Sequence, residues 1–344
     1  MPKKVQTREI VPLSVLDQSP IRAGGSAADA LGETLHLARL CEALGCHRYW
    51  LAEHHASDAL AGCAPEVLLA RLGAVTKRMR IGSGGVMLPH YSPYKVAECF
   101  KLLEALYPGR MDLGIGRAPG TSQYIAAALA YGSPAASPEY FPQKLLDLEA
   151  LLHDEAPATP GLEKARAYPR TDYVPALWLL GSSEDSALLA AQQGLPYNFA
   201  CFINPGIRED IFRLYRERFR PGRTRAKPWA CLTVFAICAD TEEEAQRLSL
   251  SRELWYLKLA ARHQGGGFPP PEEAEQHPFT DQERAFLQSR MHNSVIGTPE
   301  QVRDGLRDLL RRFEADEIMV VSITYDFAAR CRSHTLIAET WNGR

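Results

Sequence analysis

The sequence lacks the features that mark several large classes of protein. Its 344 residues carry 39 Lys and Arg against 41 Asp and Glu, a formal net charge of -2, so no bulk positive charge favours nucleic acid or an anionic membrane. No run of about 18 apolar residues is present, and the basic start has no apolar segment of signal-peptide length. We therefore expect a cytoplasmic protein with no nucleic-acid and no membrane partner.

Disulfide and metal patterns are missing as well. The eight cysteines are scattered, with no C-x-x-C pair, which predicts small buried side chains in a reducing compartment. Neither H-x-H nor H-E-x-x-H occurs, although metal-dependent hydrolases need such spacing to bring ligands to one ion. We predict no metal site. With 46% hydrophobic residues the chain can bury a large core, and this composition favours chemistry on small molecules.

What the sequence does contain is a regular alternation of apolar strands and amphipathic helices. Within residues 29–44, apolar side chains fall at i, i+3, i+4 and i+7, and Gly45 follows as a C-cap, which predicts a helix with one buried stripe. Similar units recur every 30 to 40 residues or so, roughly the size of a βαβ unit with parallel strands. The predicted strands are residues 11–17, 48–52, 80–88, 110–116, 176–181, 197–203, 230–238 and 317–324.

Eight such strands predict an α/β fold, a (β/α)8 TIM barrel, built as a single domain over residues 1–344. A doubly wound open sheet is the alternative, but it usually carries G-x-G-x-x-G after its first strand, and "LDQSPIRAGG" does not match. Longer spacers at 118–176 and 264–297 predict insertions after strands 4 and 7. The second begins "GGGFPPPEEAEQHPF", whose Gly and Pro content predicts no regular structure.

Three titratable side chains, Glu53, His54 and His55, follow the second strand. In a (β/α)8 barrel the carboxyl ends of the strands form the active-site rim. Because successive side chains of an extended segment point to opposite faces, only one of the two histidines can point into the barrel mouth. The same geometry argues against a metal held by both. The alternative interpretation is a solvated loop whose side chains bind backbone groups.

Two further strand ends carry groups suited to an anion. Arg117 follows the fourth strand, and its planar guanidinium can bind a phosphate. The start of the helix after the fifth strand offers free N–H groups and a favourable dipole, together with Ser182, Ser183 and Ser186. The alternatives are a surface ion pair for the arginine and a plain serine N-cap for the helix. No Walker A sequence is present, so we predict no nucleoside triphosphate site.

In their order along the chain, several motifs resemble the bacterial luciferase-like family of flavin-dependent monooxygenases. They are "PLSVLDQSP", "YWLAEHH", "RIGSGGVMLPHYSP", "RMDLGIGRAPG", "LLGSSEDSALLAA" and "IGTPEQV", which together span most of the chain. The sequence is most similar to the members labelled alkanal or alkane monooxygenases. The resemblance implies a (β/α)8 barrel that takes reduced FMN from a separate flavin reductase and uses O2 to oxidise a small organic substrate.

The resemblance also implies roles for individual residues. His54 matches the catalytic histidine of the family, and the role of His55 beside it stays open. A histidine over a flavin can move a proton near neutral pH, because its unperturbed pKa is about 6.5. Gly84 and Gly85 match the place of a non-proline cis peptide beneath the isoalloxazine ring. The positions that hold the FMN phosphate match Arg117, Ser183 and Ser186, with Ser182 as a further contact.

The chain also departs from luciferase itself. Gly116 stands where the light-producing subunit carries a reactive cysteine, so light emission and an aldehyde substrate are not implied. Two alternatives to an FMN-dependent monooxygenase stay open, namely an F420-dependent oxidoreductase of the same superfamily and a flavin-binding protein without turnover. We expect a homodimer. The substrate depends on the two long spacers, whose folding the motifs do not predict.

Overall fold

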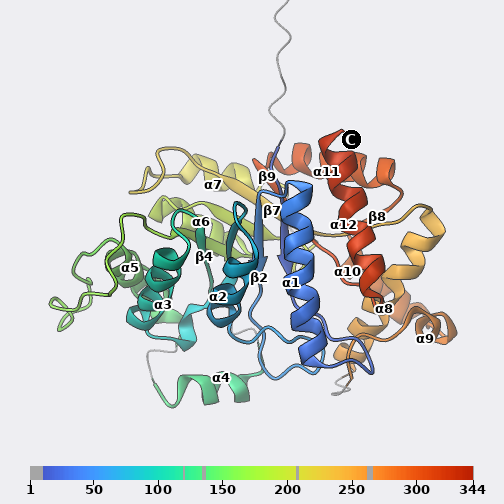
Figure 1. Cartoon of the computed structure of the whole chain (residues 1–344), viewed down its shortest axis with the longest axis horizontal. Coiled ribbons are helices and arrows are strands. Elements are labelled where there is room, and N and C mark those ends of the chain that lie inside the picture. The colour runs from blue at the N-terminus through green and yellow to red at the C-terminus, as the bar shows by residue number, and fades with distance from the viewer. Residues whose placement is uncertain (1–10, 119–120, 134–136, 207–208, 262–265, 344) are drawn as a thin grey trace, which may run out of the picture.

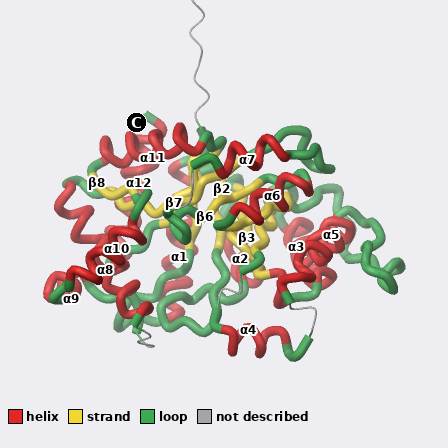
Figure 2. The backbone as a smooth tube through the Cα atoms, turned by 180° about the vertical axis from the view of Figure 1, so that it is seen from behind, coloured by secondary structure: helices red, strands yellow, loops and turns green. Residues whose placement is uncertain are grey.

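The computed structural model is a closed barrel of parallel strands surrounded by helices (Figures 1 and 2). The structure describes residues 11–118, 121–133, 137–206, 209–261 and 266–343. The strands are β1 (Leu13–Asp17), β2 (Arg48–Leu51), β3 (Arg80–Met87), β4 (Met111–Gly116), β5 (Ala176–Gly181), β6 (Tyr197–Ala200), β7 (Ala230–Cys238), β8 (Val295–Gly297) and β9 (Glu317–Val321). The barrel predicted from the sequence is confirmed.

Helices follow the strands and cover the outside of the barrel (Figure 1). The α-helices are α1 (Ala27–Leu44), α2 (Pro65–Val75), α3 (Pro93–Leu106), α4 (Gln123–Ala130), α5 (Phe141–Leu152), α6 (Glu184–Gln193), α7 (Ile211–Arg218), α8 (Glu242–Ala260), α9 (Pro271–Gln276), α10 (Asp281–Met291), α11 (Pro299–Phe313) and α12 (Phe327–Asn342). Short 3-10 turns lie at Leu88–His90 and Pro138–Tyr140. No helix in the described parts of the chain is both long and apolar enough to cross a membrane.

The barrel strands run in the order β6-β5-β4-β3-β2-β1-β9-β7, and pairing between β6 and β7 closes the ring. Every predicted strand is present, and the one expected at 317–324 is β9, which pairs with β1 and β7. The three-residue strand β8 was not predicted. It pairs with the end of β7, beyond the stretch of β7 that pairs with β9, so it extends the sheet without joining the ring.

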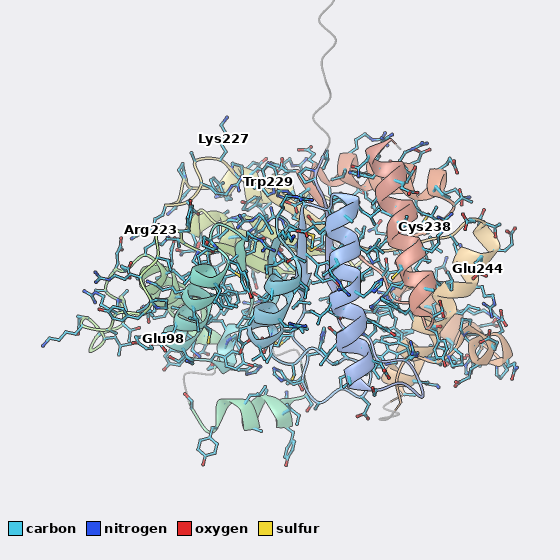
Figure 3. All side chains as sticks on the ribbon, viewed as in Figure 1. Glu98, Arg223, Lys227, Trp229, Cys238 and Glu244 are labelled. Atoms are coloured by element: carbon cyan, nitrogen blue, oxygen red, sulfur yellow. The ribbon has the colours of Figure 1, made fainter. Side chains whose placement is uncertain are left out.

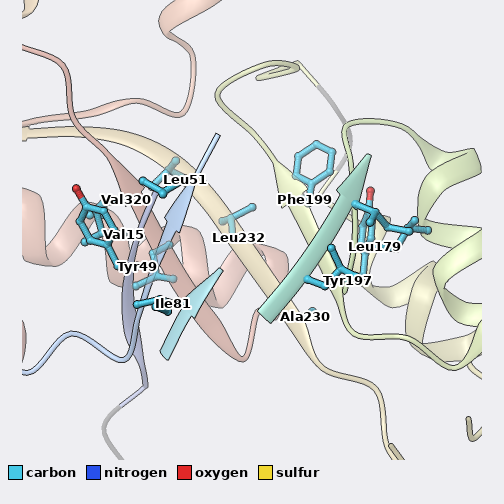
Figure 4. Packing of buried hydrophobic residues seen from close by; sticks show 14 of the residues in the cluster. Val15, Tyr49, Leu51, Ile81, Leu179, Tyr197, Phe199, Ala230, Leu232 and Val320 are labelled. Carbon is cyan, nitrogen blue, oxygen red and sulfur yellow. The ribbon is translucent and has the colours of Figure 1, made fainter. Parts of the chain in front are cut away.

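Alternation along each strand divides the core into two layers. Val15, Tyr49, Ile81 and Val320, seen together in Figure 4, point outward and pack with buried residues of the surrounding helices. The intervening positions fill the interior of the barrel, where the rings of Trp50 and Trp178 meet edge to face at 5.2 Å. Other interior side chains are Leu16, Phe235 and Met319. The barrel is therefore a packed core and not a pore.

Buried charges close the amino-terminal end of the barrel. Arg48 donates from Nη1 to Asp112 Oδ2 at 2.7 Å and from Nε to Glu317 Oε1 at 2.7 Å. Burial by itself would raise the pKa of Asp112, but Arg48 and Arg80 outweigh that effect and lower it. Removing one partner of such a buried network usually lowers the free energy of unfolding by about 3 to 5 kcal/mol. This end serves stability, which leaves the carboxyl end of the strands for a functional site.

The two insertions lie after β4 and β7, as predicted. The first contains α4, at the lower edge of Figure 1, and α5. In the second, the expectation of no regular structure is wrong over α9, because Pro271 occupies the first turn of a helix, where its missing N–H costs nothing. Phe268 is almost fully buried, and its N–H donates to the carbonyl of Ile21 at 2.8 Å. The insertion is thus tied to the loop that follows β1.

Charged side chains of both signs lie at the periphery of the molecule. Figure 3 shows Arg223 and Lys227 on the loop before β7 and Glu244 in the first turn of α8, and all three are exposed. Arg223 forms an ion pair with Glu155 across the surface.

Candidate active site

A cavity of about 330 Å3 lies at the carboxyl ends of the barrel strands. Every residue that the sequence predicts for the site lines this cavity, although these residues are spread over more than a hundred positions of the chain. They come from the ends of β2, β3, β4 and β5 and are His54, Gly84, Gly85, Arg117, Ser182, Ser183 and Ser186. The sequence pattern therefore predicts which residues meet, and their contacts indicate what each can do.

His54 follows β2, and its backbone N–H donates to the carbonyl of Gly62 at 2.8 Å. Its ring lines the cavity, and Nδ1 is buried without a hydrogen-bond partner among the described residues. Burial, and to a smaller extent the nearby His55, lower the pKa of His54 to about 4. The ring is therefore neutral at pH 7, which corrects the expectation of a histidine that titrates near neutrality. A buried nitrogen without a partner is suited to a hydrogen bond with a ligand.

His55 turns away from the cavity, as the alternation of an extended segment predicts. Its Nε2 atom lies 2.8 Å from Oε1 of Glu53, two residues earlier. The same carboxylate accepts hydrogen bonds from the Tyr91 hydroxyl at 2.8 Å and from the Met87 backbone N–H at 3.1 Å. Glu53 is only 2% exposed, yet it also lines the cavity. Glu53 is therefore not solvated, as the loop interpretation had it, although its hydrogen bond from the Met87 backbone agrees with the other half of that interpretation.

The peptide between Gly84 and Gly85 in β3 is cis, as predicted. Both positions exclude a larger side chain, because a Cβ on Gly85 would lie 2.7 Å from the carbonyl oxygen of Gly114 and one on Gly84 would lie 2.6 Å from Leu16 Cδ1. Packing against neighbouring strands therefore requires these glycines. Gly116 at the end of β4 differs, since a Cβ there would have no atom within 4 Å and would enter open space at the cavity.

Helix α6 begins beside the cavity with a serine capping box. Ser183 is the N-cap residue and accepts from the backbone N–H of Ser186, whose own hydroxyl donates to the Ser183 carbonyl at 2.6 Å. The Ser186 hydroxyl also lies 2.9 Å from that of Tyr197. Ser186 is therefore engaged inside the turn and supports its shape, while the N-terminal N–H groups and the helix dipole favour an anion at this point.

Arg117 extends from the end of β4 over the same turn. Its Nη2 atom lies 3.7 Å from Oδ2 of Asp185, and the two side chains are 46% and 76% exposed. The alternative interpretation, a surface ion pair, is thus present in the structure. Such an exposed pair contributes at most about 1 kcal/mol, so the guanidinium can exchange this partner for a bound anion.

Sequence reasoning missed the polar groups inside the barrel. Asn198 of β6 is 2% exposed and lines the cavity, and its Oδ1 accepts a hydrogen bond from Thr233 Oγ1 at 2.9 Å. The signal was a polar residue within each of the apolar strands "YNFA" and "ACLTVFAIC". Further lining residues that the motifs did not predict are Gln18, Trp50, Met87, Phe202, Ile203 and Met319.

Comparison with known proteins agrees with the fold. The family model described as luciferase-like monooxygenase matches residues 11–317. A luciferase-like monooxygenase of Escherichia coli (strain K12) is 39% identical over 330 residues, which is 96% of this chain and 97% of that protein. N-acetyl-S-alkylcysteine monooxygenase of Bacillus subtilis (strain 168) is 38% identical over 336 residues, which is 96% and 98% of the two chains.

Solved structures show the same architecture. The crystal structure of apo-MsnO8 is 39% identical and matches with a TM-score of 0.87 over 96% of this chain and 98% of that one. The oxygenating constituent of 3,6-diketocamphane monooxygenase from Pseudomonas putida, solved in complex with FMN, shares the fold at 18% identity with a TM-score of 0.70 over 96% and 97% of the chains. This chain therefore belongs to the luciferase-like monooxygenase family.

Proposed function

We propose that the chain is an FMN-dependent monooxygenase that binds reduced FMN in the cavity at the carboxyl end of the barrel. In the overall reaction, reduced FMN, O2 and a small organic substrate give FMN, the substrate with one added oxygen atom, and water. The observation that carries the proposal is the convergence of the predicted flavin-site residues on one cavity of about 330 Å3. A separate flavin reductase would supply the reduced FMN.

The residues around the cavity fit such a cofactor. The N-terminal turn of α6, with Ser182 and Ser183, and the guanidinium of Arg117 would hold the phosphate. The open space beside Gly116 and the absence of side chains at Gly84 and Gly85 would leave room for the ring system. When bound, reduced FMN supplies the electrons that activate O2. The FMN complex of the structurally similar 3,6-diketocamphane monooxygenase supports this choice of cofactor.

His54 would act as a neutral hydrogen-bonding group. At pH 7 its ring offers one N–H donor and one acceptor nitrogen, because burial keeps its pKa near about 4. A neutral imidazole can hold or transfer a proton beside a ligand. It does so without placing a net charge among the apolar side chains of Trp50 and Met319. With a ligand in place, the same apolar side chains would help to keep water out of the site.

Anaerobic titration with reduced FMN, followed by an oxygen pulse in the presence of a substrate panel, tests the proposal. We expect binding of reduced FMN and transfer of one 18O atom from labelled O2 to a substrate. Because one relative is named for N-acetyl-S-alkylcysteine, thioethers belong in the panel with alkanals and alkanes. Preferential binding of reduced F420 without oxygen uptake would indicate an F420-dependent oxidoreductase. Flavin binding without oxygen uptake for every substrate would indicate a flavin-binding protein.

The proposal includes two macromolecular partners. A second copy of the chain would form a homodimer, and the flavin reductase would act as a transient donor. Light scattering after size-exclusion chromatography measures the first. The interaction with the reductase is measured by turnover at increasing reductase concentration and constant free reduced FMN. A reductase that transfers flavin by direct contact raises turnover above the rate that free reduced FMN supports.

A further inference from the structure

Glu53 links the flavin cavity to side chains that the proposed function does not use. The carboxylate is 2% exposed and lines the cavity from the end of β2. Its Oε1 atom is shared by His55 Nε2 and the Tyr91 hydroxyl, each at 2.8 Å, and those two groups lie 3.3 Å from one another. Its Oε2 atom accepts the Met87 backbone N–H at 3.1 Å. An ionised carboxylate accepts about four hydrogen bonds, so one position stays available to a group in the cavity.

Tyr91 also reaches a second, smaller cavity on the other side of this cluster. That space of about 40 Å3 lies between β3 and α3. A water needs roughly 10 to 15 Å3 and two or more polar partners, so the second cavity has room for at least one. Tyr91, Glu66 and Lys95 offer such partners, and the Lys95 side chain is 70% exposed, which places this cavity at the surface. Tyr91 therefore lines this surface cavity while its hydroxyl donates to Glu53.

We propose that Glu53, His55 and Tyr91 form a proton relay that connects the flavin cavity to the second cavity beneath α3. The inference rests on the proposed function. Glu53 is the member of the relay at the flavin cavity, whereas His55 and Tyr91 act through it and are positioning residues. This assigns a role to the second histidine of the "EHH" stretch, which the sequence left open.

Oxidation of reduced FMN requires protons to move inside the site. Without a substrate, the reduced FMN anion, O2 and one proton give FMN and hydrogen peroxide. Two electrons and one proton pass from the flavin to oxygen, and the second proton comes from solvent. A ligand that fills the cavity closes the route through the mouth, and exchange with solvent then needs a chain of hydrogen bonds. Burial and the Glu53 carboxylate raise the pKa of Tyr91. Its hydroxyl therefore stays protonated and can donate a hydrogen bond to Glu53.

The pH dependence of such a relay includes every titratable group that faces it. His54 adjoins His55 in the segment after β2 and interacts with it electrostatically, and the ring of His90 lies 6.4 Å from that of His55. The others, from α2, α3 and the loop before α2, are Glu66, Lys95 and Cys63. Variants of the relay are therefore compared with the wild type over the whole range from acid to alkaline pH and not at one value.

Stopped-flow reoxidation of bound reduced FMN tests the relay in Tyr91→Phe and His55→Gln. The matched control is Tyr107→Phe, which removes a tyrosine hydroxyl from the other end of α3, where it donates to the Ala70 carbonyl at 2.6 Å. We expect both relay variants to bind reduced FMN within about twofold of wild type and to reoxidise it about 10 to 100-fold more slowly. We also expect their pH profile and solvent isotope effect to change, whereas those of the control stay as in wild type.

A second measurement does not depend on flavin. In the flavin-free chain, exchange of the His55 Nε2 hydrogen with solvent, followed by NMR, should be slower in Tyr91→Phe than in wild type and unchanged in Tyr107→Phe. Equal exchange, reoxidation rates and isotope effects in wild type and Tyr91→Phe, with FMN binding intact, overturn the relay alone. Weaker FMN binding with an unchanged isotope effect would show a purely structural role and also overturn it. Failure of the wild-type chain to bind reduced FMN overturns the proposed function and this inference with it.

Discussion

Nη2 of Arg117 lies 3.7 Å from Oδ2 of Asp185, so the end of β4 and the first turn of α6 meet through an exposed ion pair. In the proposed site this pair occupies the guanidinium that would bind the FMN phosphate. The carboxylate therefore competes with the cofactor, and the two residues should have opposite effects on its affinity.

Replacing Arg117 with Ala should weaken FMN binding by about 10 to 100-fold and leave riboflavin almost unaffected, because a charge-assisted contact is worth roughly 1.5 to 3 kcal/mol. Calorimetric titration of both flavins measures the effect. Arg170→Ala is the control, since Arg170 is 62% exposed, faces the half-buried Asp154 at 3.8 Å and does not line the cavity. Equal weakening of FMN and riboflavin would contradict the assignment of Arg117 to the phosphate.

Replacing Asp185 with Asn should tighten FMN binding about 2 to 5-fold, since an exposed ion pair of at most about 1 kcal/mol no longer competes for Arg117. The gain should shrink at high salt, where exposed charges are screened. Titration at low and high ionic strength measures both. An affinity that falls in the variant would mean that Asp185 supports the site instead of competing with the cofactor.

Replacing His54 with Ala should leave the fold and FMN affinity nearly unchanged, because the side chain lines a cavity and has no hydrogen-bond partner on its buried Nδ1 among the described residues. The oxidation of substrate should slow by about 100 to 10,000-fold, the usual range for a positioned proton-transfer group. Substrate-dependent oxygen use at saturating reduced FMN measures this, with the exposed His292→Ala as control. Wild-type turnover in His54→Ala would remove the catalytic role.

The stability of the protein should fall in acid partly through His54 and His334. Burial is the main cause that lowers the pKa of each to about 4, against about 6.5 in the unfolded chain. Above pH 6.5 the two histidines are neutral in both the folded and the unfolded chain, so they do not change the free energy of unfolding. Between 6.5 and 4 the unfolded chain binds more protons, so the free energy of unfolding falls as pH falls, by up to about 3 kcal/mol per residue, and the loss is complete below 4.

Urea unfolding at pH 7.5, 5.5 and 4.5 tests this with wild type and His54→Ala. The variant should lose less stability between 7.5 and 4.5, because it lacks one of the two groups. The same loss in both proteins would show that the pKa of His54 is the same in the folded and the unfolded chain.

Two glycines at the cavity should respond differently to alanine. Gly85→Ala should lower the free energy of unfolding by about 1 to 3 kcal/mol, because the new Cβ would lie 2.7 Å from the backbone oxygen of Gly114. Gly116→Ala should leave stability unchanged, since its Cβ would meet no atom within 4 Å. It should weaken FMN binding only if the ring system occupies that space. Chemical denaturation and FMN titration of the two variants separate packing from cofactor contact.

The sequence by itself determined the barrel and which residues at the strand ends meet at the cavity. Apolar runs identify each barrel strand, and the carboxyl ends of parallel strands meet at one face, so His54, Arg117 and Ser183 had to converge. It did not predict β8, whose three residues are too few for a periodic signal, or α9, where a proline that discourages helices elsewhere starts one.

Only the tertiary structure decided the chemical state and partners of those residues. His54 is neutral because strands and loops distant in sequence bury it. Tyr91 contacts Glu53 and His55 because β2 and β3 lie side by side. Asn198 enters the cavity for the same reason, through a strand with no motif of its own. Burial and hydrogen bonding depend on neighbours brought together by the fold, whereas periodicity and strand ends are local properties that one sequence contains.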